Sequence, residues 1–555
     1  MRPTALTPPC PSLADAPSSS EAGHPAPPGQ QGDERALLCR VALQDPQAFA
    51  LLDARFAPPA RRSLHRCLRQ ADLVDDVLQE VMRVLVLFLS LTCVALGLSS
   101  RLPLRAGAPS AHAAASPEEM ASQVTAPNDS GFARTIHADG GAVIDPSNPF
   151  FQSLGANGRA CVSCHVPSEN MTITPAGVQK RFHQTAGQDP IFRPNDGSNA
   201  PNLDVSTVQA RRQAYSMLLT KAVIRVGLGI PAHAEFRLVE VQDLYGYASA
   251  AELSLFRRPL PATNLAFLTT VMWDGRENVV PPTNPANLAL DLAHQANSAT
   301  LGHAAATQPL SDAQRTAIVD YETALYTAQV HDRAASNLIA RGAHGGPDLL
   351  AAQLFYFGIN DVLGADPTGA PFTPVVMTDF DAWQGVSGGG VHTARQAVAR
   401  GQALFNTKPF TIAGVGGLND QFFGGQAIPG TCTVCHDTPN VGNHSVPAPL
   451  NLGLATPRPL GELDVSGLPL YTLQHTQTGE TVTVTDPGRA LITGKWEDIG
   501  KFKGPVLRGL AGRAPYFHNG SAPSLEAVVN FYDVRFNIGL TDQEKADLVA
   551  FLRSL

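Results

Sequence analysis

Two short stretches of sequence decide how this chain folds: Cys161-Val162-Ser163-Cys164-His165 and Cys432-Thr433-Val434-Cys435-His436. Both are C-x-x-C-H motifs, the pattern for covalent attachment of a c-type haem. Two thiols a helical turn apart reach the two vinyl groups of one porphyrin, and the adjacent histidine becomes an iron ligand. A tetrahedral zinc site built from both cysteine pairs is the alternative.

The four motif cysteines are the only cysteines after Cys93, so no further thiol there competes for haem attachment. We therefore expect two covalently bound haem c groups. The expected attachment residues are Cys161, Cys164, Cys432 and Cys435, and the expected metal ligands on the motifs are His165 and His436.

Length and composition fit a soluble protein with more than one domain. The chain has 555 residues, enough for two or three domains with cores of their own. Its net charge of −8 argues against a nucleic-acid binder. We expect a mainly α fold with two cytochrome c-like haem domains, irregular insertions and a small β-hairpin.

The first 81 residues differ from the rest. Residues 1–32 are rich in Pro, Ser, Ala and Gly, which predicts disorder. Residues 33–81 are helical in pattern and rich in arginine, and the run ADLVDDVLQEV at 71–81 resembles region 2 of extracytoplasmic-function sigma factors. No helix-turn-helix region follows, and any amphipathic helix pair is the alternative.

An apolar run, Val84–Leu98, comes next and has the length of a signal-peptide core. Met82-Arg83 supplies a start and a positive charge, and Ala111-His112-Ala113 supplies a cleavage site. We expect residues 82–113 to be a signal peptide, with residues 1–81 an upstream extension of the gene model. Haem attachment to C-x-x-C-H motifs occurs outside the bacterial cytoplasmic membrane, so we expect a periplasmic protein; an uncleaved membrane anchor is the alternative.

The exported part divides into an N-terminal haem domain (114–335), a connection with an insertion (336–390) and a C-terminal haem domain (391–555). Periodicity and capping signals predict the elements within it. The expected helices are Gln209–Val226, Ser311 to about Val330, His392–Phe405 and one that starts at Thr541, and the expected hairpin is Tyr471–Thr485.

Three further motifs give the chain a specific resemblance. They are Trp273-Asp274-Gly275-Arg276, Leu507-Arg508-Gly509 and Pro515-Tyr516-Phe517-His518-Asn519-Gly520. Together with the haem motifs, over residues 130–555, they resemble the bacterial di-haem cytochrome c peroxidase and MauG family. That resemblance implies a peroxidatic haem in the first domain and an electron-transfer haem in the second.

The same resemblance implies the reaction and the partners. Members reduce hydrogen peroxide to water with electrons from a small redox protein, such as a cytochrome c or a cupredoxin, through the C-terminal haem. Calcium lies between the domains in the peroxidases, and many relatives form homodimers. The mature protein is not expected to bind nucleic acid. A MauG-like oxidase that acts on a protein or organic substrate, and a non-catalytic di-haem electron carrier, are the alternatives.

At the first haem the family pattern supplies three catalytic candidates. Trp273 matches the tryptophan between the haems, and Gln295 matches the family's distal glutamine. No glutamate stands where the acid–base residue is expected, but His303 lies close to that place and an imidazole can move a proton near neutral pH. His303 can equally bind iron or lie in the core or at the surface; His183 and His294 are weaker distal candidates.

At the second haem the family pattern points to Tyr532. No methionine follows Met377, so a methionine ligand downstream of the motif is excluded. The family's ligand falls fourteen positions after the histidine of P-Y-F-H, which is Tyr532 here, as in MauG-type members. The alternative ligands are His518, His444 and His475. Lys503 and Arg508 are candidates for neutralising haem propionates.

Overall fold

The computed structural model describes residues 121–279, 285–437 and 449–555, within a compact unit formed by residues 114–555. The expected disordered segment (1–32), sigma-like segment (33–81) and signal peptide (82–113) lie outside the described residues. None of the helices in the described ranges has the length and hydrophobicity needed to cross a membrane.

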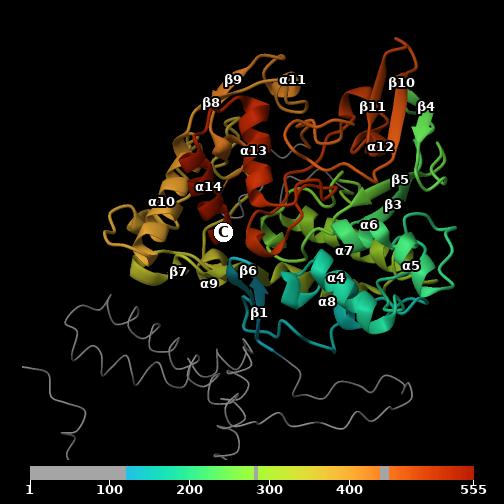
Figure 1. The fold of residues 1–555 in the computed structure, drawn as a ribbon, viewed down its shortest axis with the longest axis horizontal. Helices are drawn as coiled ribbons and strands as arrows, with labels where there is room; N and C mark the ends of the chain where they lie inside the picture. Colours follow the sequence, from blue (N-terminus) through green and yellow to red (C-terminus); the bar gives the residue numbers. More distant parts are fainter. Residues whose placement is uncertain (1–120, 280–284, 438–448) are drawn as a thin grey trace, which may run out of the picture. The chain divides into compact units, whose positions relative to one another are not determined.

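The described chain is helix-rich, and α-helices lie in both halves of the sequence (Figure 1). The two haem motifs each form a single turn of 3-10 helix, at Cys161–Ser163 and Cys432–Val434. The α-helices are α4 (Pro175–Thr185), α5 (Val208–Ala214), α6 (Ser216–Lys221), α7 (Pro285–Gly302), α8 (Asp312–Thr323), α9 (Pro347–Ala351), α10 (Val391–Thr407), α11 (Asn419–Phe422), α12 (Ala490–Thr493), α13 (Leu525–Phe536) and α14 (Asp542–Ser554).

In the described part of the chain, four small antiparallel sheets accompany the helices, which is more strand than the single hairpin expected from sequence. Their orders are β1-β2-β6-β7, β11-β10-β4, β3-β5 and β8-β9. The strands are β1 (Gln123–Asn128), β2 (Gly131–His137), β3 (Ile224–Leu228), β4 (Phe236–Gln242), β5 (Leu253–Arg257), β6 (Leu325–Asp332), β7 (Ser336–Asn337), β8 (Phe410–Ile412), β9 (Ile428–Gly430), β10 (Leu470–His475) and β11 (Thr481–Val484).

The second haem motif rests on a core made by α10, α13 and α14, which lie together in Figure 1. Phe405 of α10 packs on Phe551 of α14, with ring centroids 5.5 Å apart. Gly401 lets the two helices approach closely, because a Cβ there would clash with the backbone oxygen of Asp547. The helices predicted to include 392–405 and to start at Thr541 are confirmed, the latter with its Thr541–Glu544 capping box.

The first motif rests on a separate core. Phe150 lies 5.0 Å from the ring of Tyr321 on α8 and 6.2 Å from the ring of His165. Cys161 packs against this cluster. The capping box Ser311–Gln314 starts α8 as predicted. The helical elements therefore place each C-x-x-C-H turn beside an aromatic core.

Two predicted helices are wrong in extent. The segment 209–226 holds α5, α6 and the start of β3, because Ile224–Leu228 pairs with β5. The helix from Ser311 ends at Thr323 rather than near Val330, because Leu325–Asp332 is the strand β6 that pairs with β2. Tertiary strand pairing overrides the helical pattern in both cases.

The predicted hairpin is confirmed and has a third strand. β10 pairs with β11, and its other edge pairs with β4, which lies more than two hundred residues earlier.

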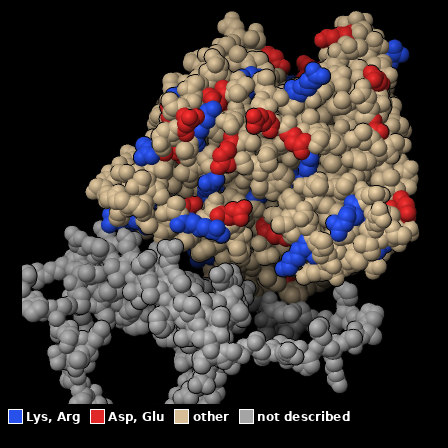
Figure 2. Space-filling model, viewed as in Figure 1, with Lys and Arg blue, Asp and Glu red and all other residues tan. Residues whose placement is uncertain are grey.

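The C-terminal residue also contacts the first half, since the backbone N–H of Gln329 on β6 donates to the oxygen of Leu555 (3.3 Å). Figure 2 shows acidic and basic side chains interspersed on the face in view.

Candidate active site: two cavities

A large cavity opens beside the first motif. Its walls include Cys161, Cys164 and His165, and it encloses about 1390 Å³, part of it open to solvent. The turn holds its shape because the backbone N–H of His165 donates to the oxygen of Cys161 (3.0 Å). The two thiols and the imidazole therefore border one space, as attachment of a single porphyrin requires.

His165 is prepared to bind a metal. Its Nδ1 lies 3.2 Å from the backbone oxygen of Met171, and a carbonyl only accepts, so Nδ1 carries the proton and Nε2 keeps its lone pair. Burial, followed by the charge of His303, lowers the pKa of His165 to about 4 despite the hydrogen bond to Met171. The imidazole is therefore neutral at neutral pH, the form that binds metals.

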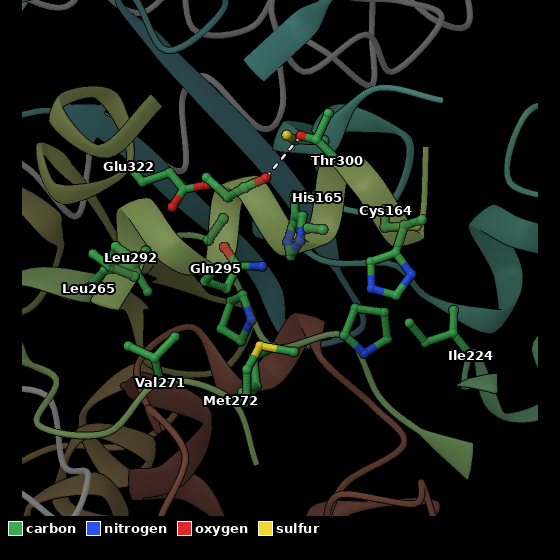
Figure 3. A pocket seen from close by; sticks show the side chains of 18 of the residues that line it. Cys164, His165, Ile224, Leu265, Val271, Met272, Leu292, Gln295, Thr300 and Glu322 are labelled. Carbon is green, nitrogen blue, oxygen red and sulfur yellow. Dashed lines mark hydrogen bonds between the residues drawn. The ribbon is translucent and has the colours of Figure 1, made fainter. Parts of the chain in front are cut away.

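One face of α7 forms a wall of this cavity. Gln295 is on that face, and His303 follows directly after the helix, at the same cavity. The other lining residues of this stripe are Leu292, Ala296, Ala299 and Thr300, at helical spacing. Gln295 and His165 are directed into the same space in Figure 3. Both catalytic candidates of the distal side therefore border the cavity.

The two weaker distal candidates, His183 and His294, do not line the first cavity. His183 on α4 is exposed and lines neither cavity. His294 on α7 points away from the cavity, half-exposed, with Nδ1 2.7 Å from the carboxylate of Glu277.

Glu322 also lines the first cavity, although no sequence motif points to it. It is 5 % exposed on α8, and Figure 3 places it on the side of Leu265 and Leu292, away from Cys164. Burial raises its pKa to about 8. The signal was present in the sequence, because Glu322 lies on the stripe of α8 that carries Ile318, Val319 and Tyr321. A carboxyl on an apolar helix face is a candidate proton-holding group.

Replacing Glu322 with Gln is expected to flatten the pH dependence of stability. The folded protein keeps the Glu322 proton up to about pH 8, whereas the unfolded chain releases it near the usual value. Wild-type stability therefore falls between about pH 5 and pH 8 by ~1.4 kcal/mol per pH unit from this group. Urea unfolding of wild type and variant across this range measures the difference, and parallel curves would contradict it.

A second cavity borders the second motif. It spans about 1570 Å³, part of it open to solvent, and its walls include Cys432, Cys435, His436 and, from α13, Tyr532. The rings of His436 and Tyr532 have centroids 6.1 Å apart at 75°. Burial raises the pKa of the Tyr532 phenol. An imidazole and a phenol thus border the same cavity, the donor pair that the sequence predicts.

Only one of the alternative ligands borders the second cavity within the described ranges. His475 is hydrogen-bonded to Thr478 in the hairpin turn, away from the cavity, and His444 lies outside the described residues. His518 does line it, stacked on Phe502 with centroids 3.9 Å apart. Neither ring nitrogen of His518 has a hydrogen-bond partner among the residues that the structure describes, although the residue is 1 % exposed.

Trp273 lies at both cavities. It is 8 % exposed and lines each of them. Its Nε1 donates to the backbone oxygen of Arg258 (2.8 Å), and its ring centroid is 6.3 Å from that of His518. The backbone oxygen of Trp273 accepts from the N–H of Lys503 (2.9 Å). The indole is therefore held at fixed orientation between the two sites.

A buried ionic cluster anchors the Trp273 loop. Asp274, fully buried, accepts from Arg257 (2.5 Å) and Arg276 (3.2 Å), and Arg257 also binds Asp486 through two nitrogens (2.7 and 2.9 Å). Burial opposes ionisation of Asp274, but the two arginines hold its pKa at about 2. Asp274 and Arg276 thus lock the turn, and Asp486 ties it to the C-terminal half.

The two propionate candidates differ in position. Lys503 lines both cavities, and its Nζ donates to the backbone oxygen of Thr270 (3.0 Å). Burial lowers its pKa to about 7. Arg508 lines neither cavity and pairs with Asp379 (2.9 Å). Lys503 therefore keeps the position expected of a propionate partner, whereas Arg508 does not.

The residues fit two haem groups. Each cavity has two thiols and a histidine at its edge. The second cavity is also lined by His518, a buried imidazole whose nitrogens make no hydrogen bond to the described residues. The cysteine pairs border different cavities, which is incompatible with one zinc ion held by all four thiols. Within the described ranges, no three His, Cys, Asp or Glu side chains cluster in a way that could hold a metal ion. The described residues therefore offer no such group of ligands for the expected calcium ion.

Comparisons with known proteins agree with these motifs. A family model for RoxA-like, cytochrome c-like proteins matches residues 501–537. The cytochrome-c peroxidase IdrP1 of Denitromonas iodatirespirans is 32 % identical over 197 residues, which is 32 % of this chain and 44 % of that protein. The cytochrome c peroxidase Ccp of Escherichia coli (strain K12) is 40 % identical over 76 residues, 13 % of this chain and 16 % of that protein.

A solved MauG-like protein associated with microbial copper homeostasis aligns with a TM-score of 0.26 and 17 % identity, covering 56 % of this chain and 77 % of that one. The chain spans less than half the length of the curated relatives named above.

The motifs, the cavities and the sequence relatives are consistent with a c-type cytochrome. Over the segments compared, the chain is similar to cytochrome c peroxidases, as the motifs predict.

Proposed function

We propose that this protein is an exported di-haem oxidoreductase that reduces hydrogen peroxide to water with electrons from a small redox protein. The observation that carries the proposal is the pair of Cys-Cys-His cavities with Trp273 in the wall of each. The bound haems would supply redox-active iron, held by His165 in the first cavity and by His436 and Tyr532 in the second. The electrons enter at the second cavity, and peroxide reacts in the first.

The side chains of the first cavity suit this reaction. Peroxide reduction needs a group that takes a proton from one oxygen and returns it to the other. His303 and Gln295 line the same cavity as His165. His303 is the proton-transferring group, and Gln295 is a hydrogen-bonding amide. Between the sites, Trp273 is an oxidisable side chain whose indole is fixed by its hydrogen bond to Arg258.

Steady-state consumption of hydrogen peroxide by the haem-loaded protein tests the proposal. A reduced cytochrome c or cupredoxin is the donor, and its oxidation is followed by absorbance. We expect donor oxidation that requires peroxide and saturates with it. Absence of turnover after reductive pre-treatment would favour the electron-carrier alternative, and two low-spin haems in the electron-paramagnetic-resonance spectrum would support that outcome.

A MauG-like oxidase that acts on a protein or organic substrate is the second candidate. Tyr532 at the second cavity favours it, because a phenolate ligand stabilises ferric iron and makes the site a poor acceptor from ordinary donors. Peroxide-dependent oxidation of an added organic reductant, without turnover of reduced cytochrome or cupredoxin, would select this function.

Replacing Trp273 with Phe is expected to slow donor oxidation at least ~10-fold, a barrier increase of about 1.4 kcal/mol. Phenylalanine keeps a buried aromatic ring but is much harder to oxidise and cannot donate to Arg258. Stopped-flow oxidation of the pre-reduced protein by peroxide measures the effect. Trp496→Phe is the matched control, since Trp496 lines neither cavity; equal rates in all three proteins would contradict a relay role.

The remaining expectations belong to this proposal. Residues 114–335 and 391–555 are the peroxidatic and electron-transfer domains, joined by 336–390. Haem attachment at both motifs calls for export to the periplasm. A homodimer and a calcium ion are the further features that the family resemblance implies.

A further inference from the structure

His303 is held by a carboxylate that the family pattern does not predict. Its Nδ1 is hydrogen-bonded to Oδ2 of Asp196, and the other carboxylate oxygen of Asp196 accepts from Arg159. Asp196 is 5 % exposed, and Arg159 is 2 % exposed. Burial opposes ionisation of Asp196, but His303 and then Arg159 hold the pKa of its carboxyl below the usual value. Arg159, Asp196 and His303 thus form one chain of hydrogen bonds, and both Arg159 and His303 line the first cavity.

The backbone of His303 is anchored as well. Its carbonyl oxygen accepts from Asn157 Nδ2 (2.7 Å) and from Arg159 (3.2 Å). Arg159 also donates to the oxygens of Pro190 (2.8 Å) and Ile191 (2.6 Å). Because Arg159 stands two residues before Cys161, these bonds fix the end of α7 relative to the first haem motif. Both the place and the ring orientation of His303 are therefore determined.

The orientation has a chemical consequence. A carboxylate accepts hydrogen bonds only, so Nδ1 of His303 carries a proton and Nε2 is the nitrogen left for chemistry. His303 lines the first cavity together with Gln295. The arrangement of carboxylate, imidazole and cavity is the general form in which a base is oriented by a third group.

We propose that Asp196 is the positioning residue of the first cavity, which presents Nε2 of His303 to peroxide. This rests on the proposed function. Nε2 accepts the proton of one peroxide oxygen and returns it to the other, which leaves as water when the O–O bond breaks. The remaining oxygen takes up the two electrons and two protons from solvent and becomes the second water. The balance is H₂O₂ + 2 H⁺ + 2 e⁻ → 2 H₂O, with both electrons from the redox protein. Asp196 stabilises the imidazolium while His303 holds the proton.

The test uses the haem-loaded protein and the variants Asp196→Asn and Asp196→Glu. Asn removes the charge, and Glu keeps a counter-ion beside Arg159 but displaces the carboxylate from His303. We expect both to lower kcat with peroxide at least ~10-fold, within the range of proton-transfer catalysis. Glu277→Gln is the matched control, because it removes the carboxylate partner of His294, outside the cavity.

A second readout does not depend on turnover. Hydrogen cyanide must also give up its proton when it binds in such a site, so its association rate, followed by absorbance, reports the same proton acceptor. We expect the rate to fall at least ~10-fold in both Asp196 variants and to stay unchanged in Glu277→Gln. The cyanide association rate can be measured even if the wild type consumes no peroxide. Absence of peroxide turnover would therefore overturn the proposed function, whereas an unchanged cyanide rate in the Asp196 variants would overturn this inference.

A double-mutant cycle separates positioning from general structure. If Asp196 acts through His303, Asp196→Asn has no further effect in a His303→Ala background. Equal effects of Asp196→Asn in both backgrounds would overturn the proposal. So would wild-type rates in Asp196→Glu, because a residue that only balances the charge of Arg159 is replaced well by glutamate.

Discussion

Replacing His303 with Ala is expected to lower the rate of peroxide consumption by ~10²–10⁴-fold, the usual contribution of a positioned acid–base group. The residue lines the first cavity and its ring is fixed by Asp196. Alanine removes the imidazole and leaves the Arg159–Asp196 pair in place, so the buried charges stay compensated. The KM for the electron donor should be unchanged, because the donor acts at the second cavity.

His294→Ala is the control for that variant. His294 lies in the middle of α7, and His303 follows the end of that helix. Each pairs with a carboxylate, but His294 lines neither cavity. We expect wild-type kinetics for it. Unaltered turnover in His303→Ala would remove His303 from the mechanism and leave Glu322 as the titratable carboxyl to be examined next in this cavity.

Replacing Tyr532 with Phe is expected to change the spectrum of the second haem and to raise its reduction potential by on the order of 100 mV, since axial ligands set haem potentials over ~0.8 V. A phenolate is a hard anionic donor that stabilises ferric iron, and phenylalanine cannot replace it. The ring itself stays, so the packing of Tyr532 against Phe531 and Phe536 is kept. Spectroelectrochemical titration measures both effects.

Tyr516→Phe is the matched control in the same cavity. Tyr516 also lines it, but its hydroxyl donates to the backbone oxygen of Leu510 (3.0 Å). We expect an unchanged spectrum and potential. A wild-type spectrum in Tyr532→Phe would exclude Tyr532 as a ligand and direct attention to His518, whose buried nitrogens lack partners.

Sequence patterns were sufficient where the chemistry is local. The C-x-x-C-H spacing requires only one turn of chain, and each motif forms that turn. Capping boxes at Ser311 and Thr541 mark helix starts because the reciprocal bonds lie within four residues. Trp273 and Tyr532 were predicted from motif order, and the structure places each at a cavity wall.

Sequence patterns failed where distant segments decide the outcome. The helix expected to reach Val330 ends at Thr323 because β6 finds a partner in β2, nearly two hundred residues earlier. Asp196 meets His303 only because a loop after α4 folds against the end of α7. No local spacing encodes that pairing. Glu322 was recognisable as a charge on an apolar stripe, but its place in a cavity depends on the tertiary fold.

Intact-mass spectrometry of the matured protein tests the central claim most directly. The account predicts a polypeptide heavier than its amino-acid sequence by two iron porphyrins, and peptide mapping that places one thioether-linked group on Cys161 and Cys164 and the other on Cys432 and Cys435. A matured chain that carries no added porphyrin mass at either cysteine pair would contradict the account.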